Sequence, residues 1–277
     1  MVAIMKAFLD DKNLGYRKKP YYLSNQELEI MCGIVNQIKD EHYTLTEDAL
    51  VYKWKGGQTF YPHNASEFGK IAFSLADMHL LFQEIECSYC PMQFYTHFPN
   101  INVKTIKLMM YFFEKSNYIC GSIKKSLAIA LENLKNTKFP SQIIHGDAHP
   151  YNCLIDDENV TWIDYTDIHY DYRVIDLVWF IVFSVCWDEE YRYMKRIDLK
   201  YVIDFLYAYN SKNQLEKTEI EKMPYVFCIL LVYSLFSVHS FWRKKKKLEY
   251  IGYNITELED NTRYILEELK WNFHLQF

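Results

Sequence analysis

The sequence predicts an α+β protein in which a small strand-rich lobe precedes a large helical lobe. Three observations lead to this prediction. A chain of 277 residues, half of them apolar, can bury a full core. Strand-like segments and turns fill its first part, and helical patterns fill most of the rest. Gly56 and Gly57 interrupt the sequence between the two patterns, so we expect an N-terminal lobe over residues 1–55 and a C-terminal lobe over residues 56–277.

The N-terminal lobe is expected to contain a hairpin, a helix and a second hairpin. Residues 2–9 and 14–23 are strand-like and are separated by polar turn residues. A helix is predicted over residues 26–39, where apolar side chains recur on one face. Strand-like residues return over 43–54, with a turn around residues 46–48.

Beyond the glycine pair the pattern becomes helical, apart from one strand-rich stretch. Residues 64–82 carry apolar side chains at helical spacing, and further helices are predicted over 103–116 and 123–136. Three short apolar runs separated by polar loops predict strands at residues 142–144, 153–155 and 160–163. From about Asp176 onward we expect four or five helices and no strand.

Composition and charge exclude several classes of partner. The formal charge of −5 and the pI near 6.0 lack the basic excess of a phosphate-tracking protein, so we expect no nucleic-acid partner. The most apolar stretch, residues 228–242, includes polar side chains and is shorter than the roughly 20 residues that cross a bilayer. It predicts a buried helix and no membrane partner. No secretory signal pattern is visible, and we expect a cytoplasmic location.

Acidic and amide side chains gather in the strand-rich stretch of the large lobe. Asp147 is followed five residues later by Asn152, and both fall on the loop between two predicted strands. Asp164 ends the next strand. Phosphoryl transfer requires a carboxylate that orients the attacking hydroxyl, and oxygen ligands for the magnesium on the nucleotide. The spacing therefore predicts Asp147 as the base and Asn152 and Asp164 as ligands of Mg²⁺.

Residues 145–154 read HGDAHPYNCL and resemble the H-G-D-x-H-x-x-N-x-L loop of the aminoglycoside phosphotransferase and choline kinase superfamily. The Ile163-Asp164 pair resembles the metal-binding turn of the same family. The resemblance implies a protein-kinase-like fold of two lobes, with ATP or GTP as phosphate donor and Mg²⁺ as cofactor. Carried over by position, it makes Asp147 the catalytic base and puts Asn152 and Asp164 on the metal.

The resemblance continues after the metal-binding turn. In the family, a run of acidic residues follows this turn. Asp167, Asp171 and Asp176 resemble that run in their spacing, and Tyr172 stands in the place of the family's proline. The resemblance implies that His145 and Asp176 support the catalytic loop. It also implies that Asp167 and Asp171 face the acceptor, where acidic side chains suit a cationic small molecule.

The N-terminal lobe departs from the family. The strand before the glycine pair resembles the family's hinge strand, which implies that Tyr52 and Trp54 contact the nucleotide. No glycine-rich loop that could cover the phosphates precedes this strand, so we expect a shortened N-terminal lobe. The lysine that binds the phosphates remains open between Lys6, Lys18 and Lys19.

Two interpretations of the function follow. The first is an ATP- or GTP-dependent phosphotransferase that acts on a hydroxyl of a small molecule. The second is a pseudokinase or scaffold protein of the same fold, which the missing phosphate-covering loop favours. We prefer the first, because a chain freed from catalysis has no physical reason to keep the full catalytic and metal-binding set. A metal-dependent hydrolase is disfavoured, since His145 and His149 lack a third ligand at useful spacing.

Overall fold

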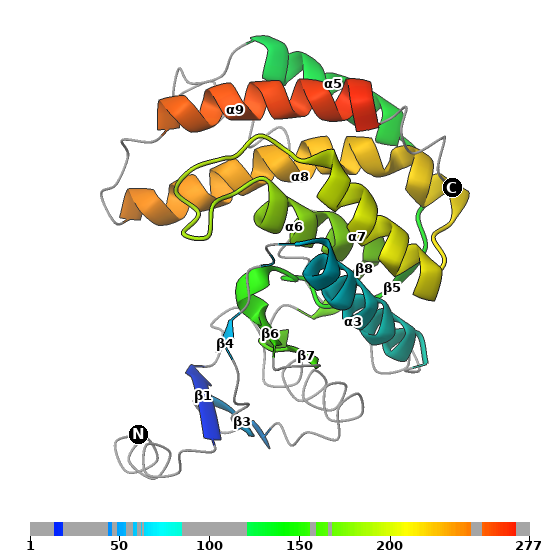
Figure 1. Ribbon diagram of the computed structural model, residues 1–277, viewed down its shortest axis with the longest axis vertical. Helices are drawn as coiled ribbons and strands as arrows, with labels where there is room; N and C mark the ends of the chain where they lie inside the picture. Colours follow the sequence, from blue (N-terminus) through cyan, green and yellow to red (C-terminus); the bar gives the residue numbers. More distant parts are fainter. Residues whose placement is uncertain are drawn as a thin grey trace.

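The computed structural model describes most of the C-terminal part of the chain and short pieces of the N-terminal part. The described residues are 14–18, 44–45, 49–53, 58–59, 62, 64–84, 121–155, 159–165, 168–244 and 251–269. Within them the chain forms three small sheets and a group of packed helices (Figure 1). The strands of the N-terminal part lie at one end of the molecule, and helices fill the other end.

Three strands of the N-terminal part form an antiparallel sheet in the order β1-β3-β2. Strand β1 (Leu14–Lys18) pairs with β3 (Ala49–Lys53), and β3 also pairs with β2 (Thr44–Leu45). The β2–β3 pair confirms the hairpin predicted within residues 43–54. The strand predicted over residues 2–9 and the helix predicted over 26–39 lie outside the described residues.

Strand β4 (Gln58–Thr59) follows the glycine pair and belongs to a different sheet. It pairs with β6 (Cys153–Ile155), which in turn pairs with β7 (Val160–Trp162). The chain has therefore passed from the first sheet to the second between residues 53 and 58. The lobe boundary at residue 55 would fall within this passage, and it remains a prediction.

Helix α3 (Ala65–Glu84) confirms the first helix predicted for the large lobe. Asn64 caps it, because its side-chain oxygen accepts a backbone N–H of the first turn at 3.1 Å. Its buried apolar face includes Phe68, Ile71, Leu75, Met78 and Phe82. Helix α5 (Gly121–Leu134) confirms the helix predicted over residues 123–136. The helix predicted over residues 103–116 lies outside the described residues.

A third sheet consists of β5 (Ser141–Ile144) and β8 (His169–Tyr172), which pair antiparallel. Strands β5, β6 and β7 confirm the three short strands predicted for this region. Strand β8 was not predicted, since its sequence HYDY has no alternating apolar pattern. It is a strand because its backbone pairs with β5. Helix α6 begins directly after β8, at Arg173 and not at Asp176.

The C-terminal helices are α6 (Arg173–Val185), α7 (Leu199–Lys212), α8 (Lys217–Lys244) and α9 (Ile251–Tyr264), and a π-helical turn (Ile265–Leu269) follows α9. Every residue of α6 is buried, so this helix forms the centre of the core. Helix α7 packs on α3, and α8 packs on both α5 and α6 (Figure 1). Within the described residues this confirms the prediction of four or five helices.

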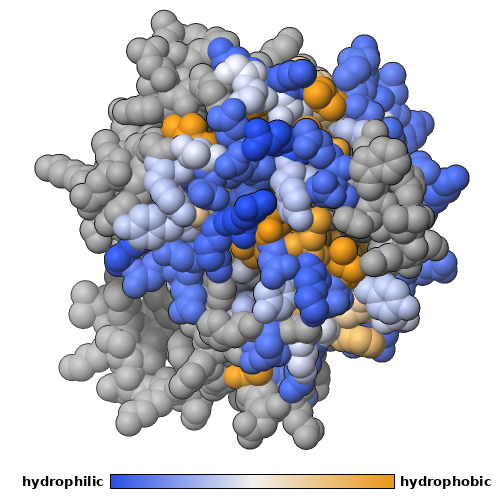
Figure 2. Space-filling model, turned by 45° about the horizontal axis from the view of Figure 1, so that its top comes forward, coloured by the Kyte–Doolittle hydropathy of each residue, from blue (hydrophilic) through white to orange (hydrophobic). Residues whose placement is uncertain are grey.

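The apolar stretch at residues 228–242 lies within α8, and the side chains at 228–232 are buried. The prediction of a buried helix is confirmed for these residues. None of the helices in the described part of the chain combines the length and apolar character needed to cross a membrane. The face of the molecule around α9 and α5 is largely hydrophilic, with scattered apolar side chains (Figure 2).

Candidate active site

The segment between β5 and β6 forms a structure that we call the 145–152 loop. It leaves β5 at His145, turns at Gly146 and closes with a 3-10 turn (Pro150–Asn152). Gly146 has a φ of 81°, a left-handed conformation that is readily available only to glycine. His149 caps the 3-10 turn, since its Nδ1 accepts the backbone N–H of Tyr151 at 3.2 Å. The loop is thus fixed at both of its ends.

We expect Gly146→Ala to destabilise the protein by about 1–2 kcal/mol, because a Cβ is costly in the left-handed region. Gly69→Ala is the matched control: Gly69 lies within α3 and a Cβ there meets nothing within 4 Å. It should stabilise the protein by roughly 0.5–1 kcal/mol. Urea unfolding measures both values. Equal effects of the two substitutions would show that the turn at Gly146 does not constrain the loop.

Asp176, in the first turn of α6, anchors the start of the 145–152 loop. Its buried carboxylate accepts the backbone N–H of His145 at 2.7 Å and that of Gly146 at 2.9 Å, and His79 Nε2 lies 3.1 Å from it. Burial raises the pKa of Asp176, but the hydrogen bond with His79 and the backbone hydrogen bond from His145 outweigh burial and lower it. An ionised Asp176 makes the contacts that the predicted supporting role requires.

The His145 ring is fully buried behind the loop. Its Nε2 donates to the carbonyl of Ile163 at 3.0 Å, and its Nδ1 accepts the N–H of Asp147 at 3.3 Å. Burial lowers the pKa of His145, so the ring is neutral. Because both nitrogens are occupied, His145 has no lone pair for a metal, which argues against the hydrolase interpretation. No group of three or more His, Cys, Asp or Glu side chains within the described ranges could hold a metal.

Asp147 presents a partly exposed carboxylate with three side-chain donors around it. Trp179 Nε1 donates to Oδ1 at 3.2 Å, whereas Asn152 Nδ2 and His149 Nε2 contact Oδ2 at 3.1 and 3.3 Å. Since His149 Nδ1 already accepts the N–H of Tyr151, His149 faces Asp147 with Nε2 as donor. Burial raises the pKa of Asp147, but His149, then His145 and Trp179, lower it to about 2. The carboxylate is thus ionised, and its 25% exposure leaves it accessible to a hydroxyl group.

Asn152 braces Asp147 with its amide group. Its Nδ2 donates to the backbone carbonyl of Asp147 at 2.9 Å as well as to the carboxylate. Because these contacts occupy the amino end of the amide, Oδ1 is the end that can bind a cation. Ile163 N–H donates to the Asn152 carbonyl at 3.0 Å, which brings Asp164, the next residue, alongside Asn152. An amide oxygen and a carboxylate are oxygen ligands of the kind that Mg²⁺ prefers.

Asp164 has a left-handed backbone conformation, with a φ of 63°. This conformation costs a non-glycine residue on the order of 1–3 kcal/mol, although aspartate tolerates it better than most. The backbone of the preceding residue, Ile163, makes two hydrogen bonds to the 145–152 loop. Its carbonyl accepts from His145 Nε2, and its N–H donates to the carbonyl of Asn152. These bonds hold Asp164 in the strained conformation at the point where the sequence predicts a metal ligand.

Several other predicted site residues lie outside the described part or away from solvent. Lys6, Lys19, Trp54 and Asp167 lie outside the described residues, whereas Lys18 and Tyr52 belong to strands β1 and β3. Asp171 lies in β8 opposite Gln142 and is only 4% exposed. The acceptor-binding role expected for Asp171 remains a prediction.

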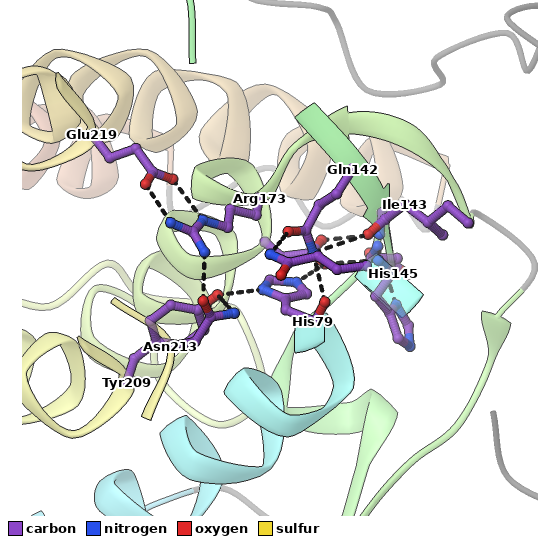
Figure 3. Close-up of polar contacts among 12 residues, drawn as sticks. His79, Gln142, Ile143, His145, Arg173, Tyr209, Asn213 and Glu219 are labelled. Carbon is purple, nitrogen blue, oxygen red and sulfur yellow. Dashed lines mark hydrogen bonds and ion pairs between the residues drawn. The ribbon is translucent and has the colours of Figure 1, made fainter. Parts of the chain in front are cut away.

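A chain of buried hydrogen bonds leads from the loop to the start of α8 (Figure 3). His79 lies between Asp176 and Tyr209, whose hydroxyl is 2.7 Å from His79 Nδ1. Asn213 Nδ2 donates to that hydroxyl at 3.2 Å, and Asn213 Oδ1 accepts from Arg173 Nη1 at 2.6 Å. All of these side chains are buried.

The chain ends at a buried ion pair. Glu219 accepts from Arg173 Nε and Nη2 at 2.9 and 2.6 Å, with both side chains at most 5% exposed. Asn213 donates to Tyr209, so the Tyr209 hydroxyl donates to His79 Nδ1, and the His79 proton lies on Nε2 toward Asp176. From Arg173 to Asp176 the hydrogen bonds therefore all run in one direction, which strengthens each of them. The sequence contains no motif that would have linked these distant residues.

A hairpin between α6 and α7, residues 187–194, meets the 145–152 loop. The Tyr151 hydroxyl donates to the carbonyl of Glu189, which joins the two segments. Asn254 of α9 holds the hairpin from another side, with two hydrogen bonds to its backbone at 2.8 and 2.9 Å. The hairpin brings three carboxylates close to the loop, those of Asp188, Glu189 and Glu190. Burial and then these carboxylates raise the pKa of Tyr151.

The family model described as the phosphotransferase enzyme family matches residues 22–209. This range contains the 145–152 loop and Asp164, together with Asp176 and Trp179 of α6. No curated protein sequence matches the chain.

Several solved structures have the same architecture. The amicoumacin kinase hAmiN has a TM-score of 0.64 at 14% identity, over 95% of this chain and 85% of that one. An aminoglycoside phosphotransferase from Alicyclobacillus acidocaldarius has a TM-score of 0.67 at 11% identity, over 94% and 87%. A choline/ethanolamine kinase family protein from Mesorhizobium loti has a TM-score of 0.63 at 11% identity, over 95% and 85%. These likenesses confirm the predicted protein-kinase-like fold.

Proposed function

Because the chain belongs to the phosphotransferase enzyme family, we propose that it transfers the γ-phosphoryl group of ATP or GTP to a hydroxyl group of a small molecule. The observation that carries the proposal is the ionised Asp147 carboxylate, which is held by three donors beside Asn152 and Asp164. A scaffold without turnover has no need for a partly exposed carboxylate whose orientation is fixed by three side-chain donors. The scaffold interpretation still depends on the missing phosphate-covering loop.

In the proposed reaction Asp147 orients the acceptor hydroxyl and takes its proton as the hydroxyl oxygen attacks the γ-phosphorus. A pKa near 2 makes Asp147 a weak base, but phosphoryl transfer asks for little proton abstraction early in the reaction. The main contribution of the carboxylate is therefore to hold the hydroxyl in line for attack. The buried contacts of Asp176 keep the backbone beneath Asp147 fixed during this step.

We propose Asn152 Oδ1 and the Asp164 carboxylate as the protein ligands of Mg²⁺. A bound magnesium ion would neutralise charge on the phosphate oxygens. Two protein ligands suffice, because Mg²⁺ at such sites takes most of its remaining ligands from phosphates and water. In support, hAmiN was solved in complex with AMP-PNP, Ca²⁺ and Ami. Lys6, Lys18 and Lys19 remain the candidates for the phosphate-binding lysine, and Tyr52 and Trp54 those for the nucleotide base.

A cationic acceptor suits the surroundings of the loop. The acidic residues of the 187–194 hairpin lie beside Tyr151, within the same part of the molecule as Asp147. A protonated amine on the acceptor would be attracted to these carboxylates and would bring the neighbouring hydroxyl towards Asp147. Asp167 and Asp171 remain proposed acceptor ligands.

Nucleotide binding separates a kinase from a scaffold before any acceptor is known. We expect MgATP or MgGTP to raise the melting temperature by about 5–10 °C at 100 times the Kd, where binding stabilises the folded protein by about 2.7 kcal/mol. Asp164→Asn keeps a residue that tolerates the left-handed backbone but removes the charge, so the magnesium-dependent part of the increase should disappear. Asp204→Asn, on α7 and paired with Lys200, is the control and should leave the increase intact.

Two results would contradict the proposal. A magnesium-dependent increase that survives in Asp164→Asn would remove Asp164 from the metal site. A wild-type protein that responds to neither nucleotide would favour the scaffold interpretation.

A further inference from the structure

Trp179 lies against Asp147 although nothing in the local sequence of the 145–152 loop points to it. It stands on α6, three residues after Asp176, so the two side chains share one face of the helix. Asp176 holds the backbone of the loop, and Trp179 Nε1 donates to the Asp147 carboxylate at 3.2 Å. A single buried helix thus fixes both the backbone of the loop and its most important side chain.

The contacts of Asp147 distinguish its two oxygens. Each carboxylate oxygen has two lone pairs. Oδ2 is shared by Asn152 Nδ2 and His149 Nε2, which occupy both of its lone pairs. From the described residues Oδ1 accepts one hydrogen bond, that of Trp179, which leaves one of its lone pairs for a further donor. A hydroxyl that approaches the partly exposed carboxylate therefore finds its acceptor on Oδ1.

We propose that Trp179 is a positioning residue that aims Oδ1 of Asp147 at the acceptor hydroxyl. This inference rests on the proposed phosphotransferase function. Without the indole N–H, the carboxylate would still be held at Oδ2 but could rotate Oδ1 away from the acceptor. Trp179 acts through Asp147 and does not itself take part in bond making.

In the step that Trp179 supports, the hydroxyl oxygen of the acceptor forms a bond to the γ-phosphorus of the nucleoside triphosphate. The bond from that phosphorus to the bridging oxygen breaks, and its electron pair leaves with the nucleoside diphosphate. The hydroxyl proton moves to Oδ1 of Asp147. The carboxylate becomes a carboxylic acid, and it returns the proton to solvent after the products leave.

The indole is itself rigidly held, which a positioning role requires. Trp179 is only 3% exposed. Its ring meets Phe183 edge to face with centroids 4.5 Å apart, and Tyr233 lies 5.7 Å away on the other helix, α8. Packing of this kind leaves the ring few alternative rotamers. The direction of its N–H is therefore set by the core and not by Asp147.

Trp179→Phe tests the proposal, because it removes the N–H and keeps an aromatic ring in the core. Turnover should fall about ten- to a hundredfold, the effect of losing a hydrogen bond to a charged group, while the KM for nucleotide stays unchanged. Trp187→Phe is the matched control. Trp187 is also buried and also uses its indole N–H, but donates it to Ser234 Oγ at 2.9 Å. It should match Trp179→Phe in stability and keep wild-type turnover.

A spectroscopic measurement needs no acceptor. In ¹⁵N-labelled protein the indole N–H resonance of Trp179 is identified by its loss in Trp179→Phe, and that of Trp187 by its loss in Trp187→Phe. Asp147→Ala removes the charged acceptor, so the Trp179 resonance should move upfield while the Trp187 resonance stays in place. A folded protein with an unmoved Trp179 resonance would show that the hydrogen bond is absent.

The outcomes separate this inference from the proposed function. If the wild type consumes nucleotide with an acceptor, and Trp179→Phe is as active as Trp187→Phe, Trp179 does not position Asp147 and the proposed function stands. If the wild type consumes no nucleotide with any acceptor of a broad panel, the proposed function fails and the role of Trp179 in turnover fails with it. A loss of turnover confined to Trp179→Phe, together with the shifted resonance, supports both.

Discussion

We expect Asp147→Asn to lower turnover by about 10²- to 10⁴-fold, the usual contribution of a positioned general base. Asparagine keeps the size of the side chain but cannot take the hydroxyl proton. Its amino group must also face a donor, either Trp179 Nε1 or the pair of donors at Oδ2, so the hydroxyl is held less well. Nucleotide affinity should change little, since the proposed metal ligands are Asn152 and Asp164.

The same substitution should alter how stability depends on pH. The pKa of Asp147 in the folded protein, about 2, lies below its ordinary value of 3.8. The stability gained from this difference is present above about pH 4 and is lost as the pH falls towards 2. It amounts to on the order of 2 kcal/mol. Asp147→Asn should therefore be somewhat less stable at neutral pH, and its stability should fall less steeply between about pH 4 and pH 2.

Nucleotide consumption with a panel of small-molecule alcohols and amino alcohols measures the first effect, and urea unfolding over the acid range measures the second. Asp204→Asn serves as control, because Asp204 lies on the outer side of α7 in an ion pair with Lys200. A loss of turnover far larger than the loss of stability would support the kinase. An inactive but folded wild type, in which Asp147→Asn changes stability alone, would support the scaffold.

The local part of the site could be predicted from the sequence. Asp147 and Asn152 lie on one short loop and Asp164 follows the next strand, so their spacing along the chain carries most of the information about their arrangement. The strands and helices that flank them also follow local patterns, as β6, β7 and α3 illustrate. The family resemblance added the expected supporting role of Asp176.

Contacts between distant segments could not be predicted. Trp179 has the apolar surroundings of any core tryptophan, and only the packing of α6 against the loop gives its N–H an acceptor 32 residues away in sequence. Strand β8 forms because β5 lies next to it, and its residues show no strand pattern of their own. The family resemblance implied a place at the acceptor for Asp171, and only the pairing of β8 with β5 accounts for its burial. These contacts depend on segments that are distant in sequence, and a single sequence does not show which distant segments pack together.

The buried ion pair between Arg173 and Glu219 should have the largest effect on stability of any side-chain pair in the site. The pair lies at the far end of the hydrogen-bonded chain that runs through Asn213, Tyr209 and His79 to Asp176 (Figure 3). Removing one partner leaves the other charge buried without compensation, which costs about 3–5 kcal/mol. Since small domains are stable by only about 5–15 kcal/mol, Glu219→Ala should lower the free energy of unfolding by a large fraction of the total.

A double-mutant cycle isolates the interaction. Glu219→Ala and Arg173→Met should each be strongly destabilising, and the double variant should be less destabilised than the sum of the two by at least about 1 kcal/mol, because no unpaired charge remains. The exposed pair of Lys212 and Asp77, with nitrogen and oxygen 3.0 Å apart, is the matched control and should cost less than about 1 kcal/mol when broken. Urea unfolding measures all of these values. If Glu219→Ala costs no more than Asp77→Ala, the pair is not a source of stability. The hydrogen bonds nearer to Asp176 would then hold the 145–152 loop without a contribution from the ion pair.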